Sequence, residues 1–173
     1  MNIFGKAAVV TGASRGVGKA TAMALAKRGC SVLLNYSRSR DEAEQTAELL
    51  RASGGKAVCF PGDVSDDGVC REMMDAAARE FGRLDILVNN AGTTRFIPHG
   101  NLDEVREEDW NRILGVNVIG PFQCVRAARK YLEASVASSG PQKTAIGIAW
   151  VSGLERRACW ISSASKISAS SQY

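Results

Sequence analysis

The stretch Thr11-Gly12-Ala13-Ser14-Arg15-Gly16-Val17-Gly18 gives the strongest indication of the fold, because it joins an apolar run at residues 7–10 to a helical pattern that continues to Leu25. A strand, a glycine-rich turn and a helix in this order predict a phosphate-binding site for a dinucleotide. The glycines allow positive φ angles and a close backbone approach, and the free N–H groups at the start of the helix attract a pyrophosphate. The same glycine spacing also occurs in ordinary strand-to-helix turns, so the rest of the chain has to decide between the two interpretations.

Alternating strand and helix patterns surround this motif. They predict strands at 6–10, 31–35, 56–60 and 85–89, helices at 16–29, 40–53, 66–81 and 106–134 with a break near residue 120, and a weaker strand at 145–151. The order predicts an α/β protein with a Rossmann-like, doubly wound parallel sheet and helices on both faces. Ligands of such sheets bind at the carboxyl ends of the strands where the winding reverses, so we expect the site in the loops after residues 10, 35, 60 and 89.

The composition narrows the class of protein. With 173 residues, 45% of them hydrophobic, the chain is long enough for one domain with a real core. Its net charge of +4 is mild and interspersed, which argues against a nucleic-acid groove or a membrane-binding surface. The 5 cysteines are odd in number and form no Cys-x-x-Cys motif, so we expect reduced packing residues and no metal site. No leader-like or membrane-spanning apolar run is present in the sequence, and we expect a cytoplasmic protein.

Three further motifs support the dinucleotide interpretation and carry a family resemblance. They are Asp63-Val64, Asn89-Asn90-Ala91-Gly92 and Asn117-Val118-x-Gly120. Together with the glycine motif they make residues 3–134 resemble a short-chain dehydrogenase/reductase of the classical type, similar to the 3-oxoacyl carrier-protein reductases. The resemblance implies hydride transfer between a nicotinamide cofactor and a carbonyl or alcohol, a small-molecule substrate, and a homo-oligomer paired through long helices.

The choice of cofactor can be predicted from the loop Asn35-Tyr36-Ser37-Arg38. Dehydrogenases that favour NAD place an acid about twenty residues past the glycines, where it binds the ribose 2′-hydroxyl. No carboxylate stands in this loop, whereas Arg38, Ser37 and Arg15 offer a hydroxyl and guanidinium groups to a 2′-phosphate. The loop therefore favours NADP(H) over NAD(H), and the resemblance implies the same preference. The alternative is that Arg15 and Arg38 are ordinary solvated surface residues.

The remaining cofactor contacts are implied by the resemblance. Asp63 would accept a hydrogen bond from the adenine amine while Val64 packs on the ring, and Asn90, Ala91 and Gly92 would line the nicotinamide ribose. Asp63 is alternatively an ordinary loop residue before a helix. The full predicted cofactor-binding set is Gly12, Ser14, Arg15, Gly16, Val17, Gly18, Asn35, Ser37, Arg38, Asp63, Val64, Asn90, Ala91, Gly92 and Lys166.

The catalytic residues depart from the family pattern. Relatives use Tyr-x-x-x-Lys, in which Lys lowers the pKa of a phenol. The corresponding place is Ser162-Ser163-Ala164-Ser165-Lys166, and the hydroxyl of Ser162 is far less acidic than a phenol with its pKa of about 10. Asn117 resembles the residue that holds a water in the proton relay, or it caps or kinks its helix. Ser152 resembles the residue that positions the substrate carbonyl. The catalytic candidates are thus Asn117, Ser152, Ser162 and Lys166.

The pattern fades after residue 135, where the sequence becomes rich in serine and diverges from the family. Residues 1–134 are family-like and 135–173 form a divergent tail of one incomplete domain, in which we expect the last strands of the sheet to be missing and a homo-oligomer to be doubtful. Two functions stay open at this point. One is an NADP-dependent reductase of the 3-oxoacyl type. The other is a catalytically impaired nucleotide-binding fragment or a non-enzymatic partner subunit.

Overall fold

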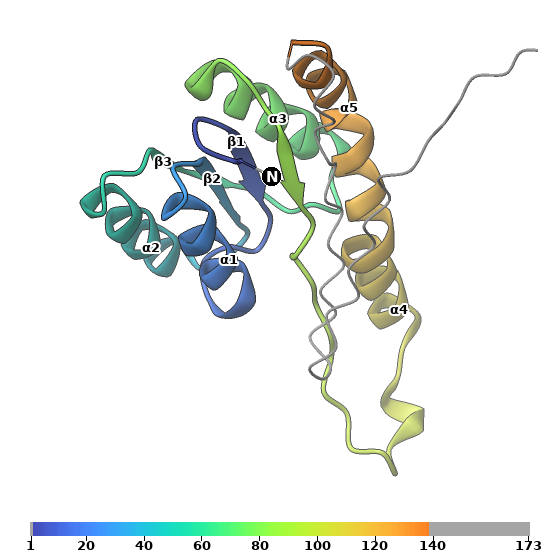
Figure 1. Cartoon of the computed structure of the whole chain (residues 1–173). Coiled ribbons are helices and arrows are strands. Elements are labelled where there is room, and N and C mark those ends of the chain that lie inside the picture. Colours follow the sequence, from blue (N-terminus) through green and yellow to red (C-terminus); the bar gives the residue numbers. More distant parts are fainter. Residues whose placement is uncertain (1, 139–173) are drawn as a thin grey trace, which may run out of the picture.

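The computed structural model describes residues 2–138, which form an alternating α/β unit (Figure 1). Its elements are β1 (Ala7–Val10), α1 (Gly16–Ala26), β2 (Ser31–Tyr36), α2 (Arg40–Ala52), β3 (Ala57–Pro61), α3 (Asp67–Phe81), β4 (Ile86–Val88), a short 3-10 turn (Leu102–Glu104), α4 (Glu107–Leu114), a π-helical turn (Gly115–Ile119) and α5 (Gly120–Ser138). The order of strands and helices is the predicted one. The predicted strand at 145–151 lies outside the described residues.

The four described strands are parallel and lie in the order β3-β2-β1-β4. Val9 of β1 pairs with Leu33 of β2 on one side and with Leu87 of β4 on the other. The chain therefore winds outward from β1 to β3 and then returns to the opposite side of β1. This reversal confirms the Rossmann-like, doubly wound sheet, and it places the switch point between β1 and β4.

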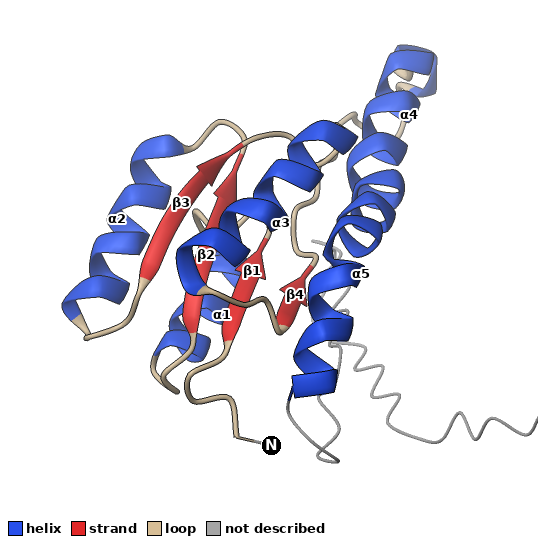
Figure 2. Cartoon of the chain, turned by 90° about the horizontal axis from the view of Figure 1, so that it is seen from above, coloured by secondary structure: helices blue, strands red, loops and turns tan. Residues whose placement is uncertain are grey.

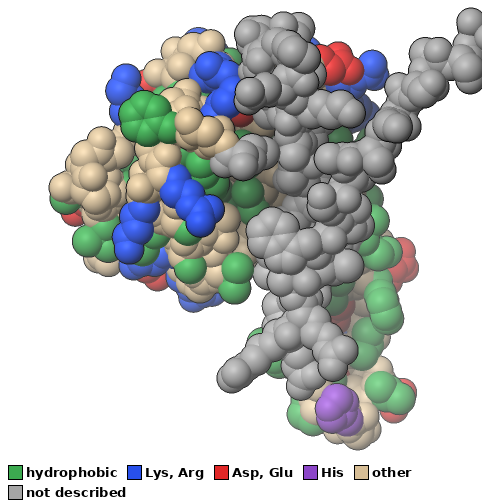
Figure 3. Space-filling model, in the orientation of Figure 1, with side chains coloured by type: hydrophobic (Ala, Val, Ile, Leu, Met, Phe, Trp, Pro, Cys, Tyr) green, Lys and Arg blue, Asp and Glu red, His purple; other side chains and the backbone are tan. Residues whose placement is uncertain are grey.

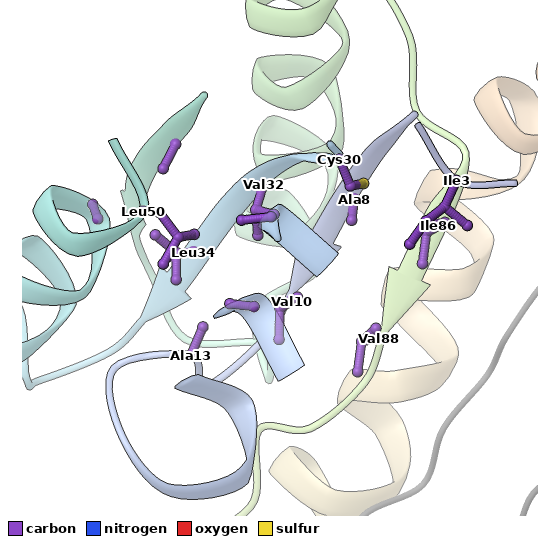
Figure 4. Packing of buried hydrophobic residues seen from close by; sticks show 14 residues of the cluster. Ile3, Ala8, Val10, Ala13, Cys30, Val32, Leu34, Leu50, Ile86 and Val88 are labelled. Carbon is purple, nitrogen blue, oxygen red and sulfur yellow. The ribbon is translucent and has the colours of Figure 1, made fainter. Parts of the chain in front are cut away.

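Both faces of the sheet are covered by helices (Figure 2). Val10, Val32 and Leu34 face α1 and α2, and Figure 4 shows Leu50 of α2 against Leu34. Val9 and Leu33 point the other way and pack against α3 and α5. Because successive residues of a strand face opposite sides, strands buried on both faces become the continuous apolar runs that the sequence shows.

Differences from the predicted boundaries have local causes. The predicted helix 16–29 ends at Ala26, because residues 27–29 turn and Gly29 takes a φ of +80°. The predicted helix 106–134 is divided into α4 and α5 by the π-helical turn at Gly115–Ile119. Pro121 cannot donate the backbone hydrogen bond that a continuous α-helix requires, and Gly120 N–H donates instead to the carbonyl of Gly115, five residues back.

The amino end of the sheet is fixed by a buried carboxylate. Asp85, which precedes β4, accepts hydrogen bonds from the guanidinium of Arg83 at 2.6 and 2.7 Å, from Ala7 N–H at 2.9 Å and from the hydroxyl of Ser135 on α5. Nζ of Lys6 lies 3.3 Å from Oδ1 of Asp85. Burial raises the pKa of Asp85, but the hydrogen bonds from Arg83, Ser135 and Ala7 outweigh it and lower that pKa to about 2. This network ties β1, β4 and α5 together on the side of the sheet opposite the site.

The structure also describes four of the cysteines and the length and apolar character of the helices. Cys30, Cys59, Cys70 and Cys124 are free thiols, and all but Cys59 are buried. Of the helices in residues 2–138, none combines the length and the apolar character that crossing a membrane requires.

Candidate functional site

A cleft of about 310 Å³ opens at the carboxyl edge of the sheet, at the switch point between β1 and β4. All four loops that follow the strands contribute to it, together with α4. Its lining residues are Gly12, Ser14, Arg15, Asn35, Tyr36, Ser37, Arg38, Ser39, Gly62, Asp63, Val64, Asn90, Ala91, Gly92, Thr93, Arg112 and Val116. The cleft therefore lies where the sequence predicts a ligand site, and most of the predicted cofactor residues meet in it. Their roles toward a cofactor stay predictions.

The three glycines of the motif have different local tasks. Gly12 has a φ of +62°, and a Cβ there would lie 2.9 Å from Cα of Ala91. A Cβ on Gly18 would lie 2.4 Å from the carbonyl oxygen of Gly12 and 2.5 Å from Nδ2 of Asn90. Gly16 has a φ of +57° and nothing within 4 Å of its Cβ position, which leaves its backbone open to a ligand. Gly12 and Gly18 thus allow close packing inside the protein.

Gly16, Val17 and Gly18 begin α1 and do not line the cleft. In the described part of the chain no side chain caps this helix, and its first turn holds no acidic residue. The N–H groups of an uncapped first turn lack helical partners and carry the positive end of the helix dipole. The start of α1 is therefore suited to an anion such as a pyrophosphate.

A pair of side chains clamps the glycine turn to the end of β4. The hydroxyl of Thr11 accepts hydrogen bonds from the N–H groups of Asn90 and Ala91, each at 2.9 Å. The amide of Asn90 donates to the carbonyls of Thr11 at 2.8 Å and Gly12 at 2.9 Å. The side chain of Asn90 thus holds the glycine turn, and Asn90, Ala91 and Gly92 all line the cleft. Thr11 was not among the predicted residues, although its place at the head of the motif was visible in the sequence.

Asn35 plays a similar part at the end of β2. Its side chain accepts from Gly12 N–H at 3.4 Å and donates to the carbonyls of Phe60 at 3.3 Å and Gly62 at 3.0 Å. Only 2% of the residue is exposed. Asn35 therefore holds the loops after β1, β2 and β3 at fixed spacing, which shapes the cleft.

Two arginines give one end of the cleft its charge. Arg15 and Arg38 both line it, and neither forms an ion pair with another residue of the described range 2–138. Lys and Arg side chains gather on the face over α1 and α2 in Figure 3. The residues at the end of β2 that line the cleft include no acid, as the sequence shows. This end of the cleft is suited to a phosphate group.

Asp63 is the acidic residue among those that line the cleft. One carboxylate oxygen of Asp63, Oδ1, accepts from the N–H of Ser65 at 3.0 Å and from its hydroxyl at 2.7 Å. The other, Oδ2, lies 2.6 Å from Nη1 of Arg112 on α4. Partial burial raises the pKa of Asp63, but the hydrogen bonds from Ser65 and the ion pair with Arg112 outweigh it and hold that pKa below its usual range. Arg112 was missed from the sequence, because only the packing of α4 brings it to Asp63.

Asn117 lies in the π-helical turn and faces the loop after β4. Its Oδ1 accepts from Thr93 N–H at 2.8 Å, and its Nδ2 donates to the Thr93 carbonyl at 2.9 Å. The side chain therefore holds the edge of the cleft, and a proton relay through this residue stays a prediction. π-helical turns are often found at functional sites. The other catalytic candidates, Ser152, Ser162 and Lys166, lie outside the described residues. Within the described residues, no cluster of three His, Cys, Asp or Glu side chains is placed to hold a metal.

A second, smaller hollow of about 170 Å³ lies beyond the sheet, between the loop that follows β4 and α4. Figure 1 shows this loop extending past the carboxyl edge of the strands before α4 begins. Most of the lining is apolar, and it consists of Arg95, Ile97, Pro98, His99, Leu102, Val105, Asp109, Trp110 and Ile113.

The fold and the place of the cleft define a Rossmann-like α/β protein. The chain belongs to the short-chain dehydrogenase family, whose model matches residues 6–171. Members of this family are oxidoreductases that bind NAD or NADP. The chain is similar to an uncharacterized oxidoreductase of Methylorubrum extorquens, with 47% identity over 128 residues, 74% of this chain and 50% of the relative. It is 40% identical over 159 residues, 86% of this chain and 62% of the relative, to a granaticin polyketide synthase protein of Streptomyces violaceoruber named as a ketoacyl reductase.

Solved structures show the same likeness. A short chain dehydrogenase from Burkholderia cenocepacia, determined in complex with NADP, has a TM-score of 0.72 and 37% sequence identity, and the match covers 76% of this chain and 53% of that one. The chain spans about half the length of several relatives that it matches.

Proposed function

We propose that this chain binds NADP(H) in the cleft and acts in the reduction of a carbonyl substrate of the 3-oxoacyl type. The main support for this proposal is the pair Arg15 and Arg38, which line the cleft and form no ion pair with another described residue. Three arginines and one aspartate line the cleft, and the aspartate is already paired with Arg112. The cleft is thus positively charged where an additional phosphate group would bind.

The cleft and the adjoining start of α1 fit the parts of such a cofactor. The open backbone at Gly16 and the uncapped start of α1 would bind the pyrophosphate, and Arg15, Ser37 and Arg38 the 2′-phosphate. Asp63 and Val64 would bind the adenine, and Asn90, Ala91 and Gly92 would line the nicotinamide ribose, to which Lys166, outside the described residues, is also assigned. NADPH, when bound, supplies the hydride for the reduction. The solved relative that contains NADP and the relative named as a ketoacyl reductase support the choice of cofactor and substrate.

A second candidate function is a nucleotide-binding chain with impaired catalysis. It is favoured by Ser162, which stands where the family's proton-donating Tyr is expected. A Ser hydroxyl is a weaker acid than a phenol and reaches less far. In this case Ser162→Tyr raises the rate of NADPH oxidation with a 3-oxoacyl thioester, whereas a chain that already uses another proton donor gains nothing.

The NADP(H) proposal is tested by the ratio of the dissociation constants for NADH and NADPH in wild type, Arg38→Asp and Arg40→Asp. Arg40 begins α2 and does not line the cleft, so its variant controls for the change in net charge. A charge-assisted hydrogen bond contributes about 1.5–3 kcal/mol, so we expect Arg38→Asp to lower the ratio by about tenfold or more. Arg40→Asp should leave it nearly unchanged. An unaltered ratio in Arg38→Asp would show that the 2′-phosphate assignment is wrong.

We further propose that the chain forms a homo-oligomer through α4 and α5. Trp110, Leu114, Val118 and Phe122 are 58%, 46%, 47% and 62% exposed and recur every four residues along one helical face. In an antiparallel pair of two copies, Trp110 would lie near Phe122 of the other copy.

A further inference from the structure

Arg112 links two parts of the cleft that are far apart in the sequence. Its guanidinium Nη1 lies 2.6 Å from Oδ2 of Asp63 and 3.4 Å from the hydroxyl of Ser65. Asp63, Val64 and Ser65 form the turn that follows β3, which we call the 63–65 turn. Asp63, Val64 and Arg112 all line the cleft. The ion pair therefore belongs to the wall of the site.

Contacts at Gly115 and Gly120, which follow Arg112 in the chain, determine its position relative to the 63–65 turn. A Cβ on Gly115 would lie 3.5 Å from Cβ of Ser65. A Cβ on Gly120 would lie 2.8 Å from Cγ2 of Val64 and 3.0 Å from its carbonyl oxygen. Gly115 lies within ordinary contact distance of Ser65, and Gly120 packs closely against the backbone of Val64. The segment that carries Arg112 is therefore held beside the 63–65 turn.

The hydrogen bonds that Asp63 accepts leave one of its carboxylate oxygens able to accept another. Each carboxylate oxygen has two lone pairs. Ser65 uses Oδ1 twice, through its N–H and its hydroxyl, and Arg112 uses Oδ2 once. Among the hydrogen bonds of the described residues, Oδ2 therefore keeps one acceptor position. Without Arg112 the carboxylate would be held through Oδ1 alone, so the direction of Oδ2 would be less well fixed.

We propose that Arg112 is a positioning residue for the base of the cofactor: it orients Oδ2 of Asp63 toward the exocyclic amine and so selects a 6-aminopurine over a 6-oxopurine. This inference rests on the proposed function. The amine of adenine donates a hydrogen bond to the carboxylate, whereas the 6-oxo group of hypoxanthine is an acceptor and faces another acceptor there. Discrimination depends on how firmly the carboxylate is held, because a mobile group can turn away from the mismatched base.

The test uses the full chain and two probes, NADPH and its hypoxanthine analogue, with dissociation constants from fluorescence titration. The variants are Arg112→Leu, Arg112→Lys and Arg126→Leu. Arg126 is a matched control, because its Nη2 also lies 2.6 Å from an aspartate, Asp67, its side chain is 47% exposed against 40% for Arg112, and it does not line the cleft. Arg112→Gln replaces Arg112→Leu if the latter does not fold.

A mismatched hydrogen bond to a base costs about 1–3 kcal/mol, so we expect wild type to favour NADPH by about fivefold or more. Arg112→Leu should reduce this preference to about threefold or less, Arg112→Lys should retain more of it, and Arg126→Leu should keep all of it. If Arg112 had a purely structural role, its loss would weaken the binding of both probes equally. The ratio of their dissociation constants would then stay unchanged, and this result would overturn the proposal. Equal loss of preference in Arg126→Leu would overturn it as well. If wild type binds NADPH and the hypoxanthine analogue equally well, this inference alone is refuted. If wild type binds neither probe, the proposed function is refuted together with the inference.

Discussion

Replacing Gly18 by alanine tests how the glycine turn is built. The new Cβ would lie 2.4 Å from the carbonyl oxygen of Gly12 and 2.5 Å from Nδ2 of Asn90. These two atoms are hydrogen-bonded to each other at 2.9 Å, and the same amide binds the Thr11 carbonyl at 2.8 Å. The substitution therefore acts on the junction of β1, α1 and β4 and not on the backbone conformation of α1, whose Gly18 has an ordinary helical φ.

The magnitude follows from two opposing effects. Alanine is favoured over glycine inside a helix by up to about 1 kcal/mol. Removing the clash requires a movement of about 0.6–1 Å, since Cβ contacts below about 3.0 Å do not occur in practice, and the overpacking that remains costs about 1–3 kcal/mol. Stretching the two hydrogen bonds of Asn90 adds about 1 kcal/mol. We expect a net loss of about 1–3 kcal/mol in the free energy of unfolding, and weaker NADPH binding.

The assay is urea unfolding followed by circular dichroism, together with NADPH titration. Gly68→Ala is the matched control, because Gly68 also lies in the first turn of a helix, α3, and the atom nearest its Cβ position is Oδ1 of Asp66 at 3.1 Å. We expect Gly68→Ala to change stability by less than about 1 kcal/mol and to leave NADPH binding unaltered. If Gly18→Ala is as stable as wild type and binds NADPH equally well, the close packing of the turn is not what shapes the site.

Two further predictions concern acid stability and assembly. Asp85 has a pKa near 2 in the folded chain against 3.8 as the ordinary value, so its stabilisation of about 2 kcal/mol is present above pH 3.8 and is lost as the pH falls towards 2. Urea unfolding at several pH values should show Asp85→Asn to be less stable than wild type near neutral pH, with a smaller loss on acidification, and an equally steep loss in the variant would contradict the assignment. Val118→Glu places a charge in the exposed apolar face of α4 and α5 and should convert an oligomer to a monomer in light scattering with little change in the melting temperature. A wild-type chain that is already monomeric would refute the pairing.

Local sequence patterns were sufficient to predict the strands, the helices and the position of the cleft. Apolar runs such as residues 7–10 that alternate with helical patterns are typical of strands buried on both faces of an α/β sheet, and the loops at the carboxyl ends of parallel strands share one edge. The division of the long helix was predicted near residue 120 and found at Gly115–Ile119, because a missing proline N–H disturbs the turn that precedes the proline.

The missed features depend on contacts between distant segments. The ion pair between Arg112 and Asp63 exists only because α4 packs on the 63–65 turn, and no spacing in the sequence indicates it. Asn35 lines the cleft and its predicted cofactor contact stays a prediction, while its buried amide also joins three loops, a contact that becomes visible only when their backbones are placed. Asn117 likewise uses both polar atoms of its side chain on the backbone of Thr93.

Calorimetric titration of the 173-residue chain with NADPH and with NADH tests directly whether the cleft binds NADP(H). The arrangement of Arg15 and Arg38 in the cleft predicts saturable binding of one NADPH per chain, and weaker binding of NADH. It also predicts that NADPH at about 100 times its dissociation constant raises the free energy of unfolding by about 2.7 kcal/mol. Equal affinity for both cofactors would contradict the role of the two arginines, and absence of NADPH binding would contradict the assignment of the cleft itself.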